Sequence, residues 1–207
     1  MNANTVLSYA AALAAAYLLG AVPFGFLIGK LNGKDIRKEG SCNIGATNVS
    51  RVIGKWWGKL CFLCDFLKGF LPVFAVMHLY PEEGVLTALT ALAAMLGHIF
   101  PVYLGFKGGK GVSTAAGAAL ALCPPAVLIA GVVWTAVFFI SRYVSLASLA
   151  AALALPLSAW LLKFFAGRAL PLPAGILLIV FAALAFWRHR SNITRLLNGT
   201  ENRFGRK

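Results

Sequence analysis

The chain has 207 residues, of which 60% are hydrophobic and 12% charged, whereas soluble domains carry about 25% charged residues. Long apolar runs with so few charges exclude an ordinary soluble protein and indicate an integral membrane protein. The net charge of +13 would suggest nucleic acid in a soluble protein. In a membrane protein it is first explained by the Lys and Arg excess of cytoplasmic loops, so we expect a lipid bilayer and no nucleic acid as partner.

The N-terminal part predicts three membrane spans. Residues 6–28 form the first; no basic segment precedes them and the run is too long for a signal-peptide core, so we expect a retained span. A polar stretch at residues 30–59 is rich in Gly, Asn and basic residues. The next spans are predicted at residues 60–80 and 85–104, joined by a short acidic turn at residues 81–84.

The apolar run at residues 112–140 is too long for one span of about 20 residues. The sequence Cys-Pro-Pro at residues 123–125 interrupts it, and consecutive prolines end a helix. We therefore predict two short helices around Cys123 and Pro125, either as full crossings or as a re-entrant pair. Further spans are predicted at residues 146–162 and 172–187, and a basic tail follows.

The positions of the basic residues predict an orientation. With about seven transmembrane helices and the N-terminus outside, only Lys68, Lys163 and Arg168 lie away from the inner loops and tail. Six spans would place the basic tail opposite the first two basic loops, so the positive-inside rule favours seven and a cytoplasmic C-terminus. We predict an all-α integral membrane protein with a single domain over residues 1–207.

Two glycine-rich loops fall on the predicted cytoplasmic face. They read GSCNIGATNVSR at residues 40–51 and GFKGGKGVST at residues 105–114. A glycine loop that leads into a helix N-terminus can bind an anion, and lysine adds charge. The second loop is not a Walker A motif, because Gly111 follows Lys110 and no strand precedes it. A flexible turn with ordinary positive-inside lysines is the alternative, and the repetition on one face weakens it.

The predicted cytoplasmic face carries few candidate acid–base groups. Asp65 and Lys68 are three residues apart on a predicted helix, which indicates an internal ion pair. His98 lies near the inner end of its span, where a hydrogen bond between helices and a functional role both remain open. Cys61 and Cys64 form a lone CxxC with no second pair or nearby histidines, so we expect no metal site.

Three sequence blocks resemble the bacterial acyl-phosphate:glycerol-3-phosphate acyltransferases. They are residues 40–51, residues 97–114 with RYVSLAS following, and residues 188–204. The resemblance implies transfer of a fatty acyl group from acyl phosphate to the 1-hydroxyl of sn-glycerol 3-phosphate, as the first acylation of bacterial phospholipid synthesis. It implies no coenzyme A or carrier-protein donor, no metal and no cofactor. It also implies a multi-pass protein of the bacterial plasma (inner) membrane whose active site faces the cytoplasm.

The resemblance also assigns roles to individual residues. As catalytic residues it implies Ser41, Arg51, His189 and Asn192. As substrate-binding residues it implies Asn43, Gly45, Thr47, Lys107, Gly108, Gly109, Lys110, Ser148 and Glu201. One departure is Cys42, which stands where the family usually has glycine. The His-x4-Asp dyad of soluble-type glycerolipid acyltransferases is absent, because no Asp follows any of the three histidines at that spacing.

Other functions and two mechanisms compete with this interpretation. An anion transporter would need polar groups along the bundle up to the far face, and a lipid-binding scaffold predicts basic clusters without paired glycine loops. Within the acyltransferase hypothesis, the proton of the attacking hydroxyl goes to a substrate oxygen or to His189. Ser41 then orients a substrate by hydrogen bond; the alternative is that Ser41 is a covalent nucleophile.

Overall fold

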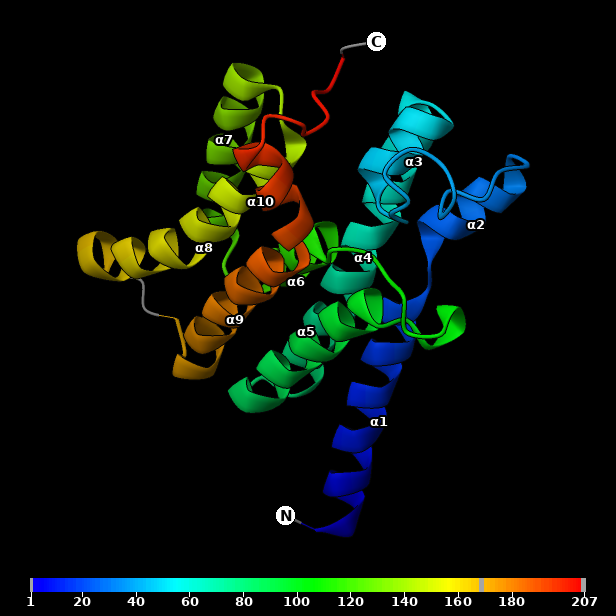
Figure 1. Ribbon diagram of the computed structural model, residues 1–207. Coiled ribbons are helices and arrows are strands. Elements are labelled where there is room, and N and C mark those ends of the chain that lie inside the picture. Colours follow the sequence, from blue (N-terminus) through cyan, green and yellow to red (C-terminus); the bar gives the residue numbers. More distant parts are fainter. Residues whose placement is uncertain (1, 168–169, 206–207) are drawn as a thin grey trace. The chain divides into compact units, whose positions relative to one another are not determined.

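The structure, a computed structural model, describes residues 2–167 and 170–205, and over these residues it is helical without strands (Figure 1). It divides into two compact units, Met1–Ala121 and Leu122–Lys207, which we describe separately. The expected all-α class is confirmed, whereas the single domain stays a prediction. Arg168, which the charge argument placed in an outer loop, lies outside the described residues.

The first unit is built around a long central helix, α4. Its helices are α1 (Ala3–Ala21), α2 (Phe24–Leu31), α3 (Ala46–Val52), α4 (Lys55–Leu79), α5 (Gly84–Ile99), the 3₁₀ turn η1 (Val102–Leu104) and α6 (Val112–Leu122). α1 and α5 pack along each other, and α4 contacts α1, α2, α3 and α5. α3 lies within the polar stretch of residues 30–59 and follows the first glycine loop, which was expected to lead into a helix N-terminus.

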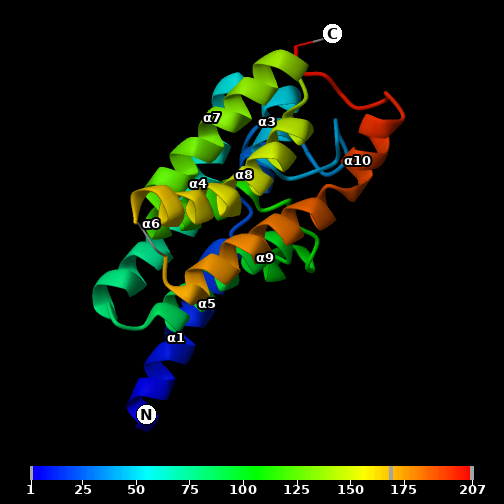
Figure 2. The same ribbon diagram turned by 90° about the vertical axis from the view of Figure 1, so that its left-hand side faces the viewer.

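The second unit contains four helices in the described part of the chain. They are α7 (Pro124–Ser141), α8 (Val144–Ala166), α9 (Leu172–Arg188) and α10 (Arg190–Leu197). α8 packs against both α7 and α9, and α10 contacts α8 and α9 (Figure 2). α9 and α10 meet at a bend of 58° at His189, so the start of the basic tail is a short helix rather than irregular chain.

Prolines explain where the observed helices differ from the predicted spans. Pro23 has no N–H to donate, and the helix predicted at residues 6–28 is interrupted there between α1 and α2, although Ala3–Leu31 together is one candidate membrane span. The second break, before Pro124, is at the expected place, but only one of its helices is short. α6 has 11 residues, whereas α7 has 18 and is long enough to cross a bilayer.

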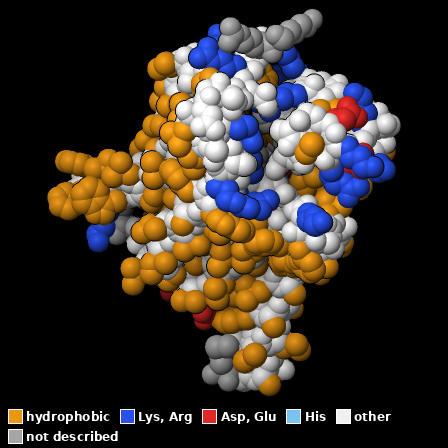
Figure 3. All heavy atoms as spheres, viewed as in Figure 1, with side chains coloured by type: hydrophobic (Ala, Val, Ile, Leu, Met, Phe, Trp, Pro, Cys, Tyr) orange, Lys and Arg blue, Asp and Glu red, His pale blue; other side chains and the backbone are white. Residues whose placement is uncertain are grey.

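The surface composition of the described residues is that of a protein in lipid. Five helices are long and apolar enough to cross a membrane, or six if the bent pair α9–α10 is one span. Large apolar side chains point outward from them: Ile140 is 86% exposed and Phe165 is 83% exposed. Figure 3 shows hydrophobic side chains along α1, whereas Lys and Arg side chains gather over α2 and α3 at the other end of the first unit. The chain is therefore an integral membrane protein.

Two close contacts with α1 hold the C-terminal half of α5. A Cβ on Gly20 would collide with the Ala94 backbone, and a Cβ on Gly97 would collide with the Tyr17 backbone. Small residues let membrane helices approach at backbone distance. The hydroxyl of Tyr17 also donates to the carbonyl of Phe100 at 2.7 Å. These contacts hold the segment that carries His98 and leads into the second glycine loop.

Candidate functional site

The first glycine loop is held by one buried side chain, Asn48 of α3. Its Oδ1 accepts the N–H of Ser41 at 2.8 Å. Its Nδ2 donates to the carbonyls of Ile36 and Glu39 at 2.9 and 3.0 Å. Asn48 is 1% exposed. Its single amide therefore makes hydrogen bonds to three backbone groups, and leaving such groups buried without a hydrogen bond would lower stability. Asn48 was not predicted as a site residue from the sequence, although its amide can donate two hydrogen bonds and also accept one.

The expected loop residues lie where this loop enters α3. Oδ1 of Asn43 accepts the N–H of Gly45 at 2.9 Å, which forms an Asx turn just before the helix begins. Thr47 lies in the first turn of α3, and Arg51 lies in its last turn. Ser41 and Arg51 are exposed, whereas Asn43 and Thr47 are half-buried. The glycine loop therefore leads into a helix as expected, and its two predicted catalytic side chains are accessible.

Two positions in the loop have left-handed backbone. Gly40 has φ +63° and Cys42 has φ +56°, a region that costs residues with a Cβ about 1–2 kcal/mol. A Cβ on Gly40 would collide with Oδ1 of Asn48, whereas the Cys42 side chain is exposed. The positive φ of Cys42 is a conformation that glycine adopts without strain, which fits the glycine that the resemblance implies at this position.

The acidic side chains before this loop are paired with cations. Arg37 lies 2.8 Å from Asp35, and Lys34 lies 3.3 Å from Glu39. The hydrogen bond from Arg37 holds the pKa of Asp35 well below its usual range. Asp35 is therefore ionised at neutral pH and a weak proton acceptor.

The second glycine loop follows η1 and folds back onto the end of α5. The N–H of Gly108 donates to the carbonyl of Ile99, and the N–H of Gly109 donates to the carbonyl of His98, each at 3.1 Å. From the sequence, we expected the glycines of this loop to let the backbone approach phosphate oxygens. In the structure the N–H groups of Gly108 and Gly109 donate hydrogen bonds to carbonyls of α5. A Cβ on Gly108 would collide with the His98 carbonyl. Lys107 is exposed and Lys110 is half-buried.

A buried cluster of ionisable side chains lies on α4 and α5. Nζ of Lys68 is 2.8 Å from Oδ1 of Asp65, which confirms the predicted ion pair. Nζ also donates to the carbonyl of Val22 at 2.8 Å, at the break between α1 and α2. Nδ1 of His98 is 3.6 Å from the same Oδ1. The cluster has no role in the sequence-based site.

In the second unit, His189 lies at the bend between α9 and α10. It is 2% exposed, and its Nδ1 is 2.7 Å from the carbonyl of Ala185. Because a carbonyl only accepts, Nδ1 carries the proton in that contact, and in a neutral ring Nε2 then carries the lone pair. Ser148, also buried, accepts from Nε1 of Trp134 at 3.3 Å.

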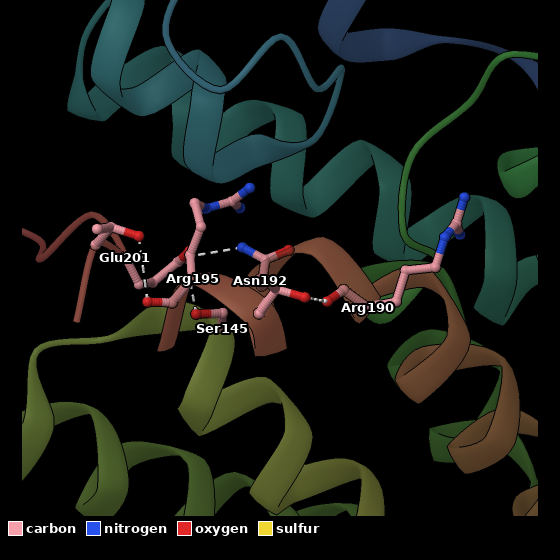
Figure 4. A network of polar contacts seen from close by, with 7 residues as sticks. Ser145, Arg190, Asn192, Arg195 and Glu201 are labelled. Atoms are coloured by element: carbon pink, nitrogen blue, oxygen red, sulfur yellow. Dashed lines mark hydrogen bonds and ion pairs between the residues drawn. The ribbon is translucent and has the colours of Figure 1, made fainter. Parts of the chain in front are cut away.

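A polar network gathers around the carboxylate of Glu201 (Figure 4). Oε1 accepts from Nδ2 of Asn192 at 2.7 Å and from the hydroxyl of Ser145 at 2.9 Å, and Oε2 accepts from Nε of Arg195 at 2.7 Å. Burial of Glu201 opposes ionisation, but hydrogen bonds from Asn192, Arg195 and Ser145 outweigh it and lower the pKa of Glu201. The resemblance implied that Glu201 binds substrate; in the structure its carboxylate accepts hydrogen bonds from Asn192, Ser145 and Arg195.

The structure thus brings the expected residues together in each unit separately. In the first unit, Ser41, Asn43, Gly45, Thr47 and Arg51 share the loop and helix that Asn48 holds, and residues 107–110 share the loop against α5. In the second unit, Asn192 and Glu201 are hydrogen-bonded partners. Within residues 2–167 and 170–205, no group of three His, Cys, Asp or Glu side chains is placed to hold a metal ion.

Comparisons with known proteins point to one family. A family model described as glycerol-3-phosphate acyltransferase matches residues 10–199. The glycerol-3-phosphate acyltransferase of Aquifex aeolicus (strain VF5) is 48% identical over 91% of this chain and 95% of the relative. That of Desulfotalea psychrophila (strain LSv54 / DSM 12343) is 49% identical over 92% of this chain and 95% of the relative.

Two solved structures agree with these relatives. One is PlsY (YgiH), an integral membrane glycerol 3-phosphate acyltransferase, in its glycerol 3-phosphate form. It has a TM-score of 0.89 and 45% identity, and the match covers 96% of both chains. The lysophosphatidic acid form of PlsY has a TM-score of 0.85 and 46% identity, also over 96% of both chains.

Proposed function

Because the chain belongs to the glycerol-3-phosphate acyltransferase family, we propose that it transfers a fatty acyl group from acyl phosphate to the 1-hydroxyl of sn-glycerol 3-phosphate. The hydroxyl oxygen forms the new ester bond to the acyl carbon, and the bond from that carbon to the phosphate oxygen breaks. The products are lysophosphatidate and inorganic phosphate. The observation that carries the proposal is the match to PlsY in its glycerol 3-phosphate form at 45% identity over 96% of the chain.

A product assay tests the reaction and the donor together. Purified protein receives labelled glycerol 3-phosphate with acyl phosphate, acyl-CoA or acyl carrier protein. We expect labelled lysophosphatidate with acyl phosphate alone. Product from acyl-CoA alone would contradict the donor, and no product from any of the three would contradict the function.

We assign the phosphate of glycerol 3-phosphate to the second glycine loop. Lys107 is exposed and Lys110 half-buried there, and a lysine contact to phosphate in a partly dry site contributes roughly 1.5–3 kcal/mol, or about 10- to 150-fold in affinity. Lys110→Ala should raise the KM for glycerol 3-phosphate by that factor. Lys163→Ala, an exposed lysine of α8, is the matched control. An unchanged KM in folded Lys110→Ala would remove Lys110 from the site.

We assign the donor phosphate to the exposed side chain of Arg51. A fixed cation stabilises the departing phosphate and the developing oxyanion, which is often the largest catalytic term. The exposed Ser41, whose N–H is held by Asn48, orients a substrate oxygen. If Ser41 is instead a covalent nucleophile, enzyme mixed with labelled acyl phosphate alone will accumulate an acyl adduct on Ser41. Mass spectrometry of the quenched mixture distinguishes the two, and we expect no adduct.

The proton of the attacking hydroxyl goes to a substrate phosphate oxygen or to His189. The contact of Nδ1 with Ala185 leaves the lone pair of a neutral His189 on Nε2, as a general base requires. Asp35 and Glu201 have lowered pKa values and are poor acceptors. Loss of about a hundredfold or more in kcat in His189→Ala would assign the proton to His189. A smaller loss assigns it to the substrate.

We propose that Asn192, Ser148 and Glu201 support this chemistry by position. Glu201 fixes the amide of Asn192.

We also propose that the chain is a plasma-membrane protein with its N-terminus outside and its C-terminus in the cytoplasm, because of how its Lys and Arg residues are distributed. A cysteine introduced at residue 207 should resist a membrane-impermeant thiol reagent in intact cells. Labelling there would contradict this orientation.

A further inference from the structure

The buried cluster of Asp65, Lys68 and His98 lies inside membrane-spanning helices. The side chains are 2%, 2% and 4% exposed. Ionisable groups in this position are expensive and are retained where they serve a function. The proposed reaction assigns them none, so their neighbours indicate what they do.

One edge of the His98 ring faces the carboxylate. Nδ1 lies 3.6 Å from Oδ1 of Asp65, which is too long for a hydrogen bond but places the ring next to the carboxylate. Lys68, at 2.8 Å from the same oxygen and bonded to the Val22 carbonyl, fixes the carboxylate in place. The ring of His98 is therefore held from the α4 side.

The other edge of the ring faces the second glycine loop. A Cβ built on Gly109 would collide with Nε2 of His98 and lie 2.9 Å from Cε1 and 3.1 Å from Cδ2. The N–H of Gly109 also donates to the carbonyl of the same residue. His98 thus contacts Gly109 through its ring and its main chain, next to the lysine assigned to phosphate.

We propose that His98, held by Asp65, is a positioning residue that places Gly109 and thereby Lys110 for glycerol 3-phosphate. This assignment rests on the proposed function. The imidazole is the surface against which the loop is seated, and the Asp65–Lys68 pair fixes that surface. His98 acts through the loop and does not touch substrate.

Two substitutions of His98 test the proposal through a split between kinetic constants. His98→Ala removes the imidazole that contacts Gly109, and we expect the KM for glycerol 3-phosphate to rise about tenfold or more. A small displacement of a binding group can reduce the efficiency of a reaction by up to about a hundredfold. The KM for acyl phosphate should change less than twofold. His98→Gln places an amide at the reach of Nε2 and should recover most of the loss. A general packing defect would lower the unfolding temperature without this selectivity or this rescue.

A double-mutant cycle with Gly109 tests the contact itself. Gly109→Ala should raise the same KM, because its methyl group displaces the ring. In His98→Ala the methyl has room, so the double variant should be no worse than His98→Ala alone, which is non-additive. Gly131→Ala is the control, because a Cβ there meets no neighbour within 4 Å.

Each outcome decides the proposal. An unchanged KM in folded His98→Ala, or additive effects in the double variant, would overturn it. If His98→Ala does not fold, His98→Gln and Gly109→Ala carry the test: a normal KM in Gly109→Ala overturns the proposal. Inactive wild-type protein would refute the proposed function instead, and a failure confined to the variants refutes this inference alone.

Discussion

Asn48 in the first unit holds a loop with candidate catalytic residues, whereas Glu201 in the second unit holds side chains of two helices, α8 and α10, by different chemistry. Asn48 is neutral and bonds to backbone groups of Ser41, Ile36 and Glu39. Glu201 is a carboxylate and bonds to side chains of Asn192, Ser145 and Arg195. An amide fixes the course of the chain, whereas a carboxylate fixes particular side chains and depends on charge. Substitutions of Asn48 and Glu201 should therefore have different effects on stability, on activity and on their pH dependence.

The largest expected effect is that of Asn48→Ala. It leaves three backbone groups without their partner, and we expect a loss of about 2–4 kcal/mol in the free energy of unfolding. The kcat should also fall, because Ser41 loses the bond that places it. Thermal unfolding and steady-state kinetics measure both. Asn32→Ala, which removes one amide contact to the Ile28 carbonyl, is the control, and equal stability of the two variants would contradict the role of Asn48.

Gly40→Ala perturbs the Asn48 amide through a steric contact instead of removing it. We expect a loss of about 1–3 kcal/mol, from the positive φ and from the collision of the methyl group with Oδ1 of Asn48. Gly33 has φ +70° with no atom within 4 Å of a built Cβ, so Gly33→Ala measures the φ cost alone. If the two variants lose the same stability, the contact between Gly40 and Asn48 contributes nothing.

Glu201→Gln should cost less, about 1–2 kcal/mol, since Arg195 is 37% exposed and water screens the charged contact. The KM for glycerol 3-phosphate should change little if Glu201 acts by position and not by binding substrate. A large rise in the KM for glycerol 3-phosphate with unchanged stability would instead support the expectation that Glu201 binds substrate.

The pH dependence of stability distinguishes the Asn48 contacts from the Glu201 contacts most sharply. Because the pKa of Glu201 is lowered in the folded protein, its stabilisation is present above the unfolded pKa near 4 and is lost as pH falls through the folded pKa. The stability gap between wild type and Glu201→Gln should therefore close below about pH 4. The deficit of Asn48→Ala should persist there, because an amide does not titrate. Unfolding temperatures from pH 7 to pH 3 test this contrast.

The smallest expected effect is that of Cys42→Gly. Glycine relieves the left-handed strain but adds freedom to the unfolded chain, so we expect a net gain of about 0.5 kcal/mol. Activity should remain at the wild-type level. A loss of stability would show that the exposed Cys42 side chain makes a favourable contact.

The sequence predicted the apolar spans well because hydropathy and proline punctuation are local signals. The break before Pro124 and the Asp65–Lys68 pair follow from residues close in the chain. The role of Asn48 was missed because its partners lie up to 12 residues away in irregular chain. The seating of Gly109 on His98 was missed because a glycine has no side chain to suggest its neighbour. The interruption at Pro23 was not predicted, although a proline inside an apolar run is a local signal for it.

The bond from Lys68 to Val22 has a consequence for how the protein enters the membrane during synthesis. A lone lysine is costly at the centre of a bilayer, but the carbonyl that receives it lies 46 residues earlier in the chain. Pro23 interrupts the helix between α1 and α2 next to that carbonyl. Asp65 lies one turn before Lys68 on the same helix. Both partners are therefore made before the lysine is, and α4 can insert against a segment already able to receive its charge.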